Sequence, residues 1–597
     1  MKILRQFLGL LALVGLAVAP MKSGAASWVT ARWPGLNSTD AQGWRPPDPN
    51  GAAGPQGVIV TVNAYIAYHT KVYSSTYLWG PTLLTDFFAP AGNAGSGNAD
   101  PKVMFDRISQ RFFVVAQENA NPSTSFVNVA VSRNANPQGP TTNDWYFHRL
   151  EMKQTLLDRD FWGDYPCVGL DERAFYVTFN MFPFPKDSGN NPVDWARAAD
   201  HGRVFVFNKE NLINGTLIYR AFDVPTGFTL QPVSIVSAAT PGNTAYFSQI
   251  DSPITARIWR LDDPLGSGAP VPYEIPIPLT GAPLVGAPQS GTTVRLDPVT
   301  PRKAQGNAFW YDGSLWFCCT GANPAGRARV WYYEFRTHEF GERLPAPLLK
   351  RSGVIGDDDI PEAWTMQPAI GANSRGDICI VYSQTSGLGW PAIYFTTLPH
   401  YATPLDLFER PQMLIGSSGY YDGVQDPGRL GARWGDYATV AVDPTDDSFW
   451  ICHEYSRGSD TKDNWGTYWG RVVVPQHVIY VDHGNGCLRP EDLAYPFSEI
   501  AKYVPGWSWG TREGLGVTLD PRNPPPGAPS LPCPPAPLPC TLNACLGGPF
   551  KNVTDALAAA STGDALQIKA GNYNERPRIN KRVYLTAKGG SVFIGKP

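Results

Sequence analysis

The tetrapeptide Trp-Gly-Asp-Tyr occurs twice, at 162–165 and 434–437, and each copy opens the same longer pattern. Both copies continue with apolar residues, an Asp, a turn and an aromatic strand, as in DFWGDYPCVGLDERAFYV (160–177) and ARWGDYATVAVDPTDDSFWI (432–451). Agreement at this density between distant segments indicates an internal structural repeat. The chain should therefore fold as an architecture of repeated strand units.

Related hairpins recur between residues 57 and 475, each with Asp, Asn or Gly in the turn and aromatic or β-branched residues beside it. Four strands per unit at this spacing are typical of β-propeller blades. We expect seven blades, which begin near residues 57, 100, 164, 232, 305, 366 and 436; six is the alternative, because the unit at 232–278 matches least well. The first unit lacks an innermost strand and the last an outermost one, so we expect both termini to close the ring.

Composition supports an all-β fold. Charged residues make up 17% of the chain and aromatic residues 12%, and the 59 Gly and 57 Pro suit short strands joined by tight turns. A formal net charge of -3 creates no field that would recruit nucleic acid. We therefore expect no nucleic-acid partner.

The first 26 residues have the pattern of an export signal: Lys2 and Arg5, an apolar run, and small residues that end at Ala26. We expect cleavage after Ala26, because the alternative site at Ala19 is followed by Pro20. No later stretch approaches the roughly 20 apolar residues that span a bilayer. The sequence thus predicts a secreted or periplasmic protein without a membrane span.

The nine cysteines fall into two groups. Five lie in apolar strand-like runs and are expected to be small buried side chains. The other four lie in a Pro-rich stretch with little core of its own and are candidates for disulfides of undetermined pairing: Cys487, Cys533, Cys540 and Cys545. Zinc is the weaker alternative there, because CxxC pairs are absent.

These features divide the chain into five segments. We expect a signal peptide at 1–26, an N-terminal extension at 27–56, a β-propeller at 57–475, a Cys- and Pro-rich connector at 476–545, and a partial right-handed β-helix at 546–597.

Residues 46–475 resemble the sialidase-like propellers of secreted bacterial proteins, through segments such as DPKVMFDRISQRFF, WGDYPCVGLD and RWGDYATVAVDPTDDSFW. The resemblance implies the fold more than an activity, since it follows a structural repeat. The early Arg-Ile-Pro motif of sialidases is absent, and so is an intact S-x-D-x-G-x-x-W turn. The catalytic residues are therefore unknown.

The stretch GGPFKNVTDALAAASTGDALQIKAGNYNERPRINKRVYLTA looks like the opening of a pectin-lyase-like parallel β-helix. The resemblance implies a helical cap and one or two rungs. The rungs that carry lyase catalysis in such proteins are missing from this stretch.

The blade register places several polar residues just before innermost strands, so they should converge at one mouth of the central channel. Together with the aromatic and basic residues beside them they would form a funnel suited to a sugar or peptide. The candidate ligand-binding residues are Asp100, Arg159, Trp162, Asp164, Tyr165, Gln367, Arg433, Trp434, Asp436 and Tyr437. In the competing interpretation the same Trp and Asp residues only hold neighbouring blades together.

We expect no cofactor, although clustered carboxylates in turns could bind Ca²⁺. The candidates are Asp357 to Asp359 and, in a second turn, Asp443, Asp446 and Asp447. The simpler interpretation, which we favour, is that these are solvated turn residues.

Three functions fit the sequence. The first, which we prefer, is a secreted non-catalytic propeller that binds a glycan, a polysaccharide or a surface protein through the funnel. The second is a sialidase-like glycoside hydrolase or a polysaccharide lyase that uses funnel carboxylates. The third is a structural component of the cell envelope.

Overall fold

The computed structural model describes most residues from 27 to 481 and part of the segment from 553 to 594. Gaps lie at 72–75, 93–96, 122–123, 157–158, 185–200, 238–240, 253, 279–281, 299–303, 340, 356–361, 401–407, 427–428, 459–461, 476–477, 482–552, 561–563, 574–576 and 578–583. The expected signal peptide, the acidic turn Asp357 to Asp359, and the disulfide candidates Cys487, Cys533, Cys540 and Cys545 lie outside the described residues.

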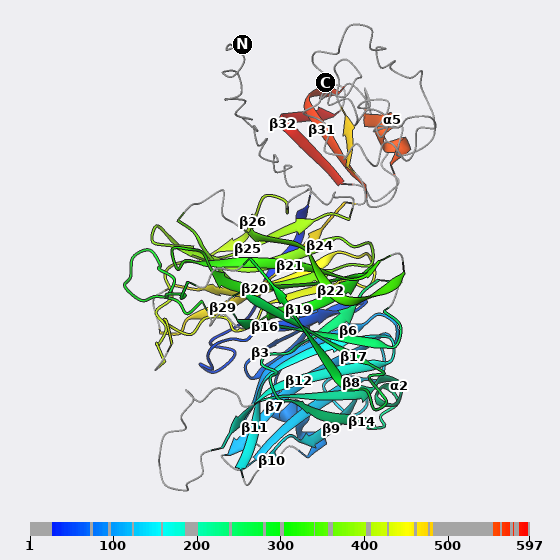
Figure 1. Cartoon of the computed structure of the whole chain (residues 1–597). Helices are drawn as coiled ribbons and strands as arrows, with labels where there is room; N and C mark the ends of the chain where they lie inside the picture. The colour runs from blue at the N-terminus through cyan, green and yellow to red at the C-terminus, as the bar shows by residue number, and fades with distance from the viewer. Residues whose placement is uncertain are drawn as a thin grey trace, which may run out of the picture.

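Strands dominate the described chain, and Figure 1 shows them stacked as successive sheets. Three sheets come from the first part of the chain. Their strands are β2 (Asn50–Ala53), β3 (Gly57–Val62), β4 (Tyr65–Thr70) and β5 (Tyr77–Leu83); β6 (Asn98–Asp106), β7 (Arg111–Asn121), β8 (Thr124–Ser132) and β9 (Trp145–Glu151); and β10 (Gln154–Leu156), β11 (Arg159–Leu170), β12 (Ala174–Pro183), β13 (His201–Asn208) and β14 (Tyr219–Val224). Their short helical insertions are α1 (Leu84–Phe88), η1 (Ala89–Ala91) and α2 (Lys209–Ile213).

An eight-stranded sheet follows, and it contains two antiparallel meanders that pair in parallel through β15 and β19. Its strands are β15 (Gln231–Ile235), β16 (Thr244–Ser252), β17 (Thr255–Asp262), β18 (Pro270–Pro276), β19 (Ala304–Tyr311), β20 (Ser314–Ala322), β21 (Ala328–Glu339) and β22 (Glu342–Ile355). The next sheet consists of β23 (Trp364–Ala372), β24 (Ile378–Ser386), β25 (Gly389–Leu398) and β26 (Gln412–Gly416).

The last sheet of the ring joins the two ends of the propeller. Its strands are β27 (Thr439–Val442), β28 (Phe449–Ser456), β29 (Trp465–Val473) and, outermost, β1 (Trp28–Asn37). Strand β1 pairs antiparallel with β29, so the missing outermost strand does come from the N-terminal segment. The first sheet, however, has its own innermost strand, β2. Both β1 and β2 lie within 27–56, so the propeller sheets draw on residues before Gly57.

The first strands of the sheets contact one another in a closed circle, in the order β2, β6, β11, β15, β19, β23, β27 and back to β2. This circle confirms the all-β propeller that the repeat predicts. Two of its members, β15 and β19, belong to one continuous sheet. The count of seven blades therefore stays a prediction.

Each first strand has a residue with positive φ, either within the strand or a few residues before it. The residues with positive φ are Asp48 (48°), Asp100 (52°), Tyr165 (61°), Thr229 (46°), Gly306 (76°), Gln367 (56°) and Asp436 (77°). In β6, β11 and β23 this residue and the following proline are skipped in the pairing register, which is a β-bulge. A proline fits there because an unpaired position needs no N–H donor. The bulges re-aim side chains at one end of the strand circle.

The core lies between the sheets and is rich in tryptophan where the ring closes. Trp33 of β1 contacts Trp450 of β28 with 4.5 Å between ring centroids. Both rings belong to a buried cluster that also holds Trp434, Trp465 and Trp469. Because these side chains come from both ends of the propeller, their burial stabilises ring closure.

The described C-terminal residues form a small parallel sheet, β30 (Val478–Val481), β31 (Ala565–Tyr573) and β32 (Tyr584–Ile594), with one helix, α5 (Val553–Ala559). Leu566 and Ile568 of β31 and Val553 and Leu557 of α5 share a buried cluster. The helix and both expected strands are present, and their pairing is parallel. Whether they belong to a β-helix stays a prediction.

Candidate functional site

A buried polar cluster lies where β2, β6, β11 and β27 begin. We call it the central cluster and define it as Asp48, Asp100, Lys102, Tyr165, Arg433, Asp436 and Tyr437. Four of its members have a positive φ: Asp48, Asp100, Tyr165 and Asp436. Non-glycine residues with positive φ are uncommon and gather at functional sites.

Two tyrosines form the middle of the central cluster. Tyr165 and Tyr437 stack with ring centroids 4.6 Å apart and planes at 26°. The Tyr437 hydroxyl donates to Asp100 Oδ2 at 2.9 Å, and the Tyr165 hydroxyl donates to the Asp436 carbonyl at 3.0 Å. The Lys102 Nζ lies 2.9 Å from the centre of the Tyr437 ring, a cation–π contact. The pair thus links three first strands that are far apart in the sequence.

Burial and mutual repulsion perturb the acids of the central cluster. Burial, with Asp164 and Asp436 nearby, raises the pKa of Asp100 to about 6. Burial and the charges of Asp100 and Asp436 raise the pKa of Asp48 well above its ordinary value. Burial also lowers the pKa of Lys102 to about 8. Two carboxyls that resist ionisation beside a base form a pattern found at functional sites.

The two tyrosines are hydrogen-bond donors and not phenolates. Burial raises the pKa of both Tyr165 and Tyr437 well above the ordinary value, and the neighbouring carboxylates add to the effect. A tyrosine acts as a nucleophile only when its proton can be removed. The resting arrangement therefore suits hydrogen bonding by the phenols rather than covalent chemistry.

Asp164 lies beside the central cluster and is only half-buried. Its Oδ1 accepts a hydrogen bond of 2.9 Å from Gln117 Nε2 on β7. Two residues earlier on the same face of β11, Trp162 stacks on the half-buried Phe182 of β12 at 5.4 Å. Trp162 is 7% exposed and Gln117 5%, so Asp164 and Phe182 are the more accessible groups here.

Ion pairs lead from Arg433 away from the centre. Arg433 binds Asp436 on one side, and its Nη1 lies 3.8 Å from Asp426 on the other. Arg45 then bridges Asp426 at 3.8 Å and Asp463 at 3.3 Å. Because Asp426 and Arg45 are more exposed than Asp436, the chain of charges runs from the core to the surface.

Three sequence candidates are not presented to a ligand. Trp434 is fully buried, donates to Ser383 Oγ at 3.0 Å and packs edge-on against Tyr421, so it is a wedge between sheets. Gln367 is 1% exposed, and its Nε2 donates to the Trp434 carbonyl at 2.9 Å. Arg159 lies at the tip of the β10–β11 hairpin, on the other face of β11 from Asp164. For Trp434 and Gln367 the scaffolding interpretation is the one that their contacts support.

Two members of the central cluster were not among the sequence candidates, Asp48 and Lys102. Asp48 is 2% exposed, its Oδ2 accepts from Asn63 Nδ2 at 2.5 Å, and its Oδ1 has no hydrogen-bond partner among the described residues. The signal was available, because Asp48-Pro49 repeats Asp100-Pro101. Lys102 follows that second Asp-Pro pair, but nothing in the sequence marks its side chain as buried.

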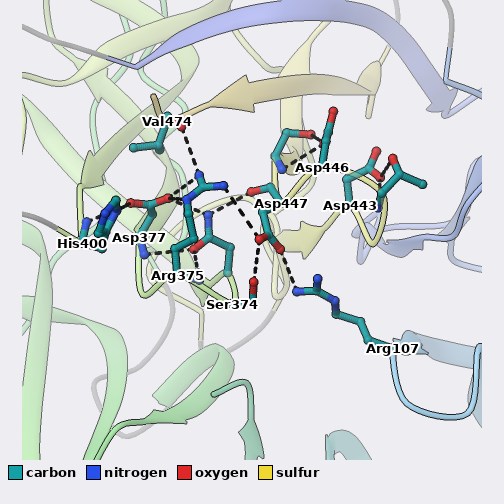
Figure 2. Close-up of polar contacts among 12 residues, drawn as sticks. Arg107, Ser374, Arg375, Asp377, His400, Asp443, Asp446, Asp447 and Val474 are labelled. Atoms are coloured by element: carbon teal, nitrogen blue, oxygen red, sulfur yellow. Dashed lines mark hydrogen bonds and ion pairs between the residues drawn. The ribbon is translucent and has the colours of Figure 1, made fainter. Parts of the chain in front are cut away.

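The acidic turn between β27 and β28 is held by cations of the protein itself, as Figure 2 shows for Asp447 and Arg107. Lys71 Nζ lies 2.7 Å from Asp443, and Arg471 binds Asp446. Burial alone would raise the pKa of Asp443, but the Lys71 ammonium and the Thr445 hydroxyl outweigh it and lower that pKa. The calcium interpretation is not supported, since basic side chains from neighbouring strands and turns contact these carboxylates.

Two other kinds of feature, a metal site and a membrane-spanning helix, are not found within the described ranges. Among those residues no group of three His, Cys, Asp or Glu side chains could hold a metal ion. The described helices include none that is long and apolar enough to cross a membrane.

No protein-family model matches the chain, and no curated protein matches it. Among solved structures, Trypanosoma rangeli sialidase with 2,3-difluorosialic acid is similar at 11% identity and a TM-score of 0.33, over 63% of this chain and 53% of that one. A Dyadobacter fermentans protein of unknown function is similar at 8% identity and a TM-score of 0.35, over 63% of this chain and 94% of that one. An exo-β-1,3-galactanase of Phanerochaete chrysosporium is similar at 10% identity and a TM-score of 0.26, over 62% of this chain and 81% of that one.

This chain thus spans about half the length of the sialidase. At such low identities and TM-scores these likenesses carry no argument about activity. The propeller fold rests on the strand circle itself, and any function must be argued from the central cluster.

Proposed function

We propose that the protein binds a glycan at the mouth formed by the central cluster, Asp164 and the Trp162–Phe182 pair. The observation that carries the proposal is the convergence on half-buried Asp100 of β6 of two other half-buried groups, Asp164 of β11 and Arg433 from the segment before β27. Carboxylates and guanidinium groups hydrogen-bond sugar hydroxyls, and aromatic faces pack against the C–H faces of sugar rings. Two alternatives, a surface protein as the ligand and a purely structural role in the envelope, are the other outcomes of the test described below.

A second candidate function is acid-assisted hydrolysis of the bound glycan, and one observation favours it. Asp100, whose pKa is raised to about 6, lies close enough to Asp164 for their charges to interact. A carboxyl group that keeps its proton near neutral pH can protonate a leaving oxygen, while an ionised neighbour supports the developing positive charge. In this case Asp100 would be the general acid.

The test is a glycan-array screen of the mature chain, followed by calorimetry on the best ligand. We expect Asp164→Asn to weaken binding about tenfold or more, the effect of losing one good charged hydrogen bond. Asp312→Asn is the control, because Asp312 lies in the exposed turn at the other end of a first strand. Equal affinity in both variants would contradict the proposal.

Incubation of the same ligand with the protein separates binding from turnover. If reducing ends appear, and Asp100→Asn abolishes them while the variant still binds, the protein is a hydrolase. If the glycan is bound and recovered intact, the non-catalytic function holds. If the array shows no ligand, a protein partner or a structural role takes its place.

A further inference from the structure

Ser27, the residue just before β1, is buried at 3% exposure. Its side-chain Oγ donates to Glu409 Oε2 at 2.8 Å, and its backbone N–H donates to the same oxygen at 3.3 Å. Gln412 Nε2 donates to the Ser27 carbonyl at 2.9 Å. The start of β1, in the closing sheet, is therefore bound by Gln412 of β26 and by Glu409 of the segment that leads into β26, both from the neighbouring sheet's part of the chain.

The Glu409 carboxylate is itself deeply buried, at 3% exposure. Thr397 of β25 donates to its Oε2 at 2.7 Å, and the Glu409 N–H donates to the Thr397 carbonyl at 2.8 Å. These contacts hold the acid in one position, pointing at the Ser27 nitrogen. A buried carboxylate is costly unless hydrogen bonds and a positive charge compensate it.

The sequence independently predicts that export cleaves the chain between Ala26 and Ser27. Water would hydrolyse this bond: its hydroxyl joins the Ala26 carbonyl carbon, and the Ser27 nitrogen takes the proton. The new α-amino group takes a further proton from solvent and becomes an ammonium at neutral pH. A donor that was a neutral amide then carries a full positive charge beside Glu409.

We propose that Ala26–Ser27 is the processing site of a signal peptidase and that the Ser27 ammonium forms a buried ion pair with Glu409. The pair fastens the first residue of the mature chain to the sheet next to the one that β1 completes. Ring closure is thus strengthened by removal of the leader, because only the cleaved chain supplies the charge.

The intact mass of the protein exported from a host with the natural leader tests the first half of this proposal. We expect a chain that begins at Ser27. A mass that places the start elsewhere, for example after Ala19, would overturn it.

Melting temperatures test the ion pair. The full mature chain beginning at Ser27 is compared with the same chain carrying Ala25 and Ala26, each released from a fusion by a protease that leaves no extra residue. We expect the Ser27 chain to melt at the higher temperature, and this comparison needs no substitution. Equal melting temperatures would overturn the ion pair.

A substitution assigns the difference to Glu409. In Glu409→Gln the two starts should melt at the same temperature, because the amide carries no charge to meet the ammonium. In the control Glu342→Gln, which alters an exposed carboxylate of β22, the difference should persist. A difference that survives in Glu409→Gln would show that the terminus acts through other contacts and would refute the proposed pair.

Discussion

The two copies of Trp-Gly-Asp-Tyr have the same residues but different surroundings. In the copy on β11, Trp162 packs on the half-buried Phe182 and the left-handed residue is Tyr165. In the copy before β27, Trp434 is fully buried and the left-handed residues are Gly435 and Asp436. The comparison teaches that the two copies differ in backbone conformation as well as in surroundings, so the repeat alone does not decide which side chains meet solvent.

The aspartates of the two copies show the same contrast. Asp164 is half-buried and takes a neutral amide, Gln117, as its partner. Asp436 is 6% exposed and is bound by the Arg433 guanidinium. Burial alone would lower the pKa of Arg433, but Asp436, Asp48 and Asp100 outweigh it and raise that pKa. The aspartate of one copy is thus half-buried beside a neutral partner, whereas the aspartate of the other is buried in an ion pair.

Alanine substitution of the two tryptophans should reveal the difference between the two copies most strongly. Trp434→Ala removes a fully buried ring and its hydrogen bond to Ser383, so we expect a loss of about 3–5 kcal/mol in the free energy of unfolding. Trp162→Ala should cost less, roughly 2–3 kcal/mol, because its ring is 7% exposed and packs on the half-buried Phe182. Urea unfolding followed by fluorescence measures both, and equal losses would contradict the assignment.

Neutralising the aspartates gives a smaller difference. Asp436→Asn leaves Arg433 without its nearest carboxylate, and we expect a loss of about 2 kcal/mol, less than for a fully buried pair because Arg433 is partly exposed. Asp164→Asn should stay within about 0.5 kcal/mol, since an Asn oxygen still accepts from Gln117. Urea titration of both variants checks the order. If Asp164→Asn costs more, the roles of the two copies are reversed.

Much of the fold follows from the sequence, because hairpin turns and strand periodicity are local signals. The helix near Val553, the buried cysteines and the N-terminal completion of the last sheet are all as expected. The innermost strand β2 was missed, since NGAA has neither aromatic nor β-branched residues. Its place in the sheet comes from pairing with β3.

The candidate site could be predicted only in part. The charges of Asp164 and Asp436 both act on Asp100, so the three lie near one another, but their role as a ligand site stays a prediction. The sequence does not predict which of these side chains are buried. The exposure of a Trp depends on side chains from distant segments, and Trp434, for example, is covered by Tyr421. The partners of the acidic turn come from similarly distant segments, for example Lys71 for Asp443.

The central claim is that carboxylates from separate sheets share one site, and the pH dependence of stability tests it most directly. Folding raises the pKa of Asp100 from that of an ordinary carboxyl to about 6, so the folded state holds this proton more tightly. The resulting penalty is absent below about pH 4, grows between about pH 4 and 6, and is complete above that. Asp100→Asn removes it, so the variant should gain about 3 kcal/mol over the wild type as pH rises through this range.

The decisive measurement repeats this comparison in an Asp164→Asn background, with thermal or urea unfolding from pH 4 to 8. Because the Asp164 charge helps to raise the pKa of Asp100, we predict that the midpoint of the stability difference moves from near pH 5 to a lower pH. The control background, Asp312→Asn, should leave the midpoint in place. An unchanged midpoint in Asp164→Asn would show that the two carboxylates do not share a site.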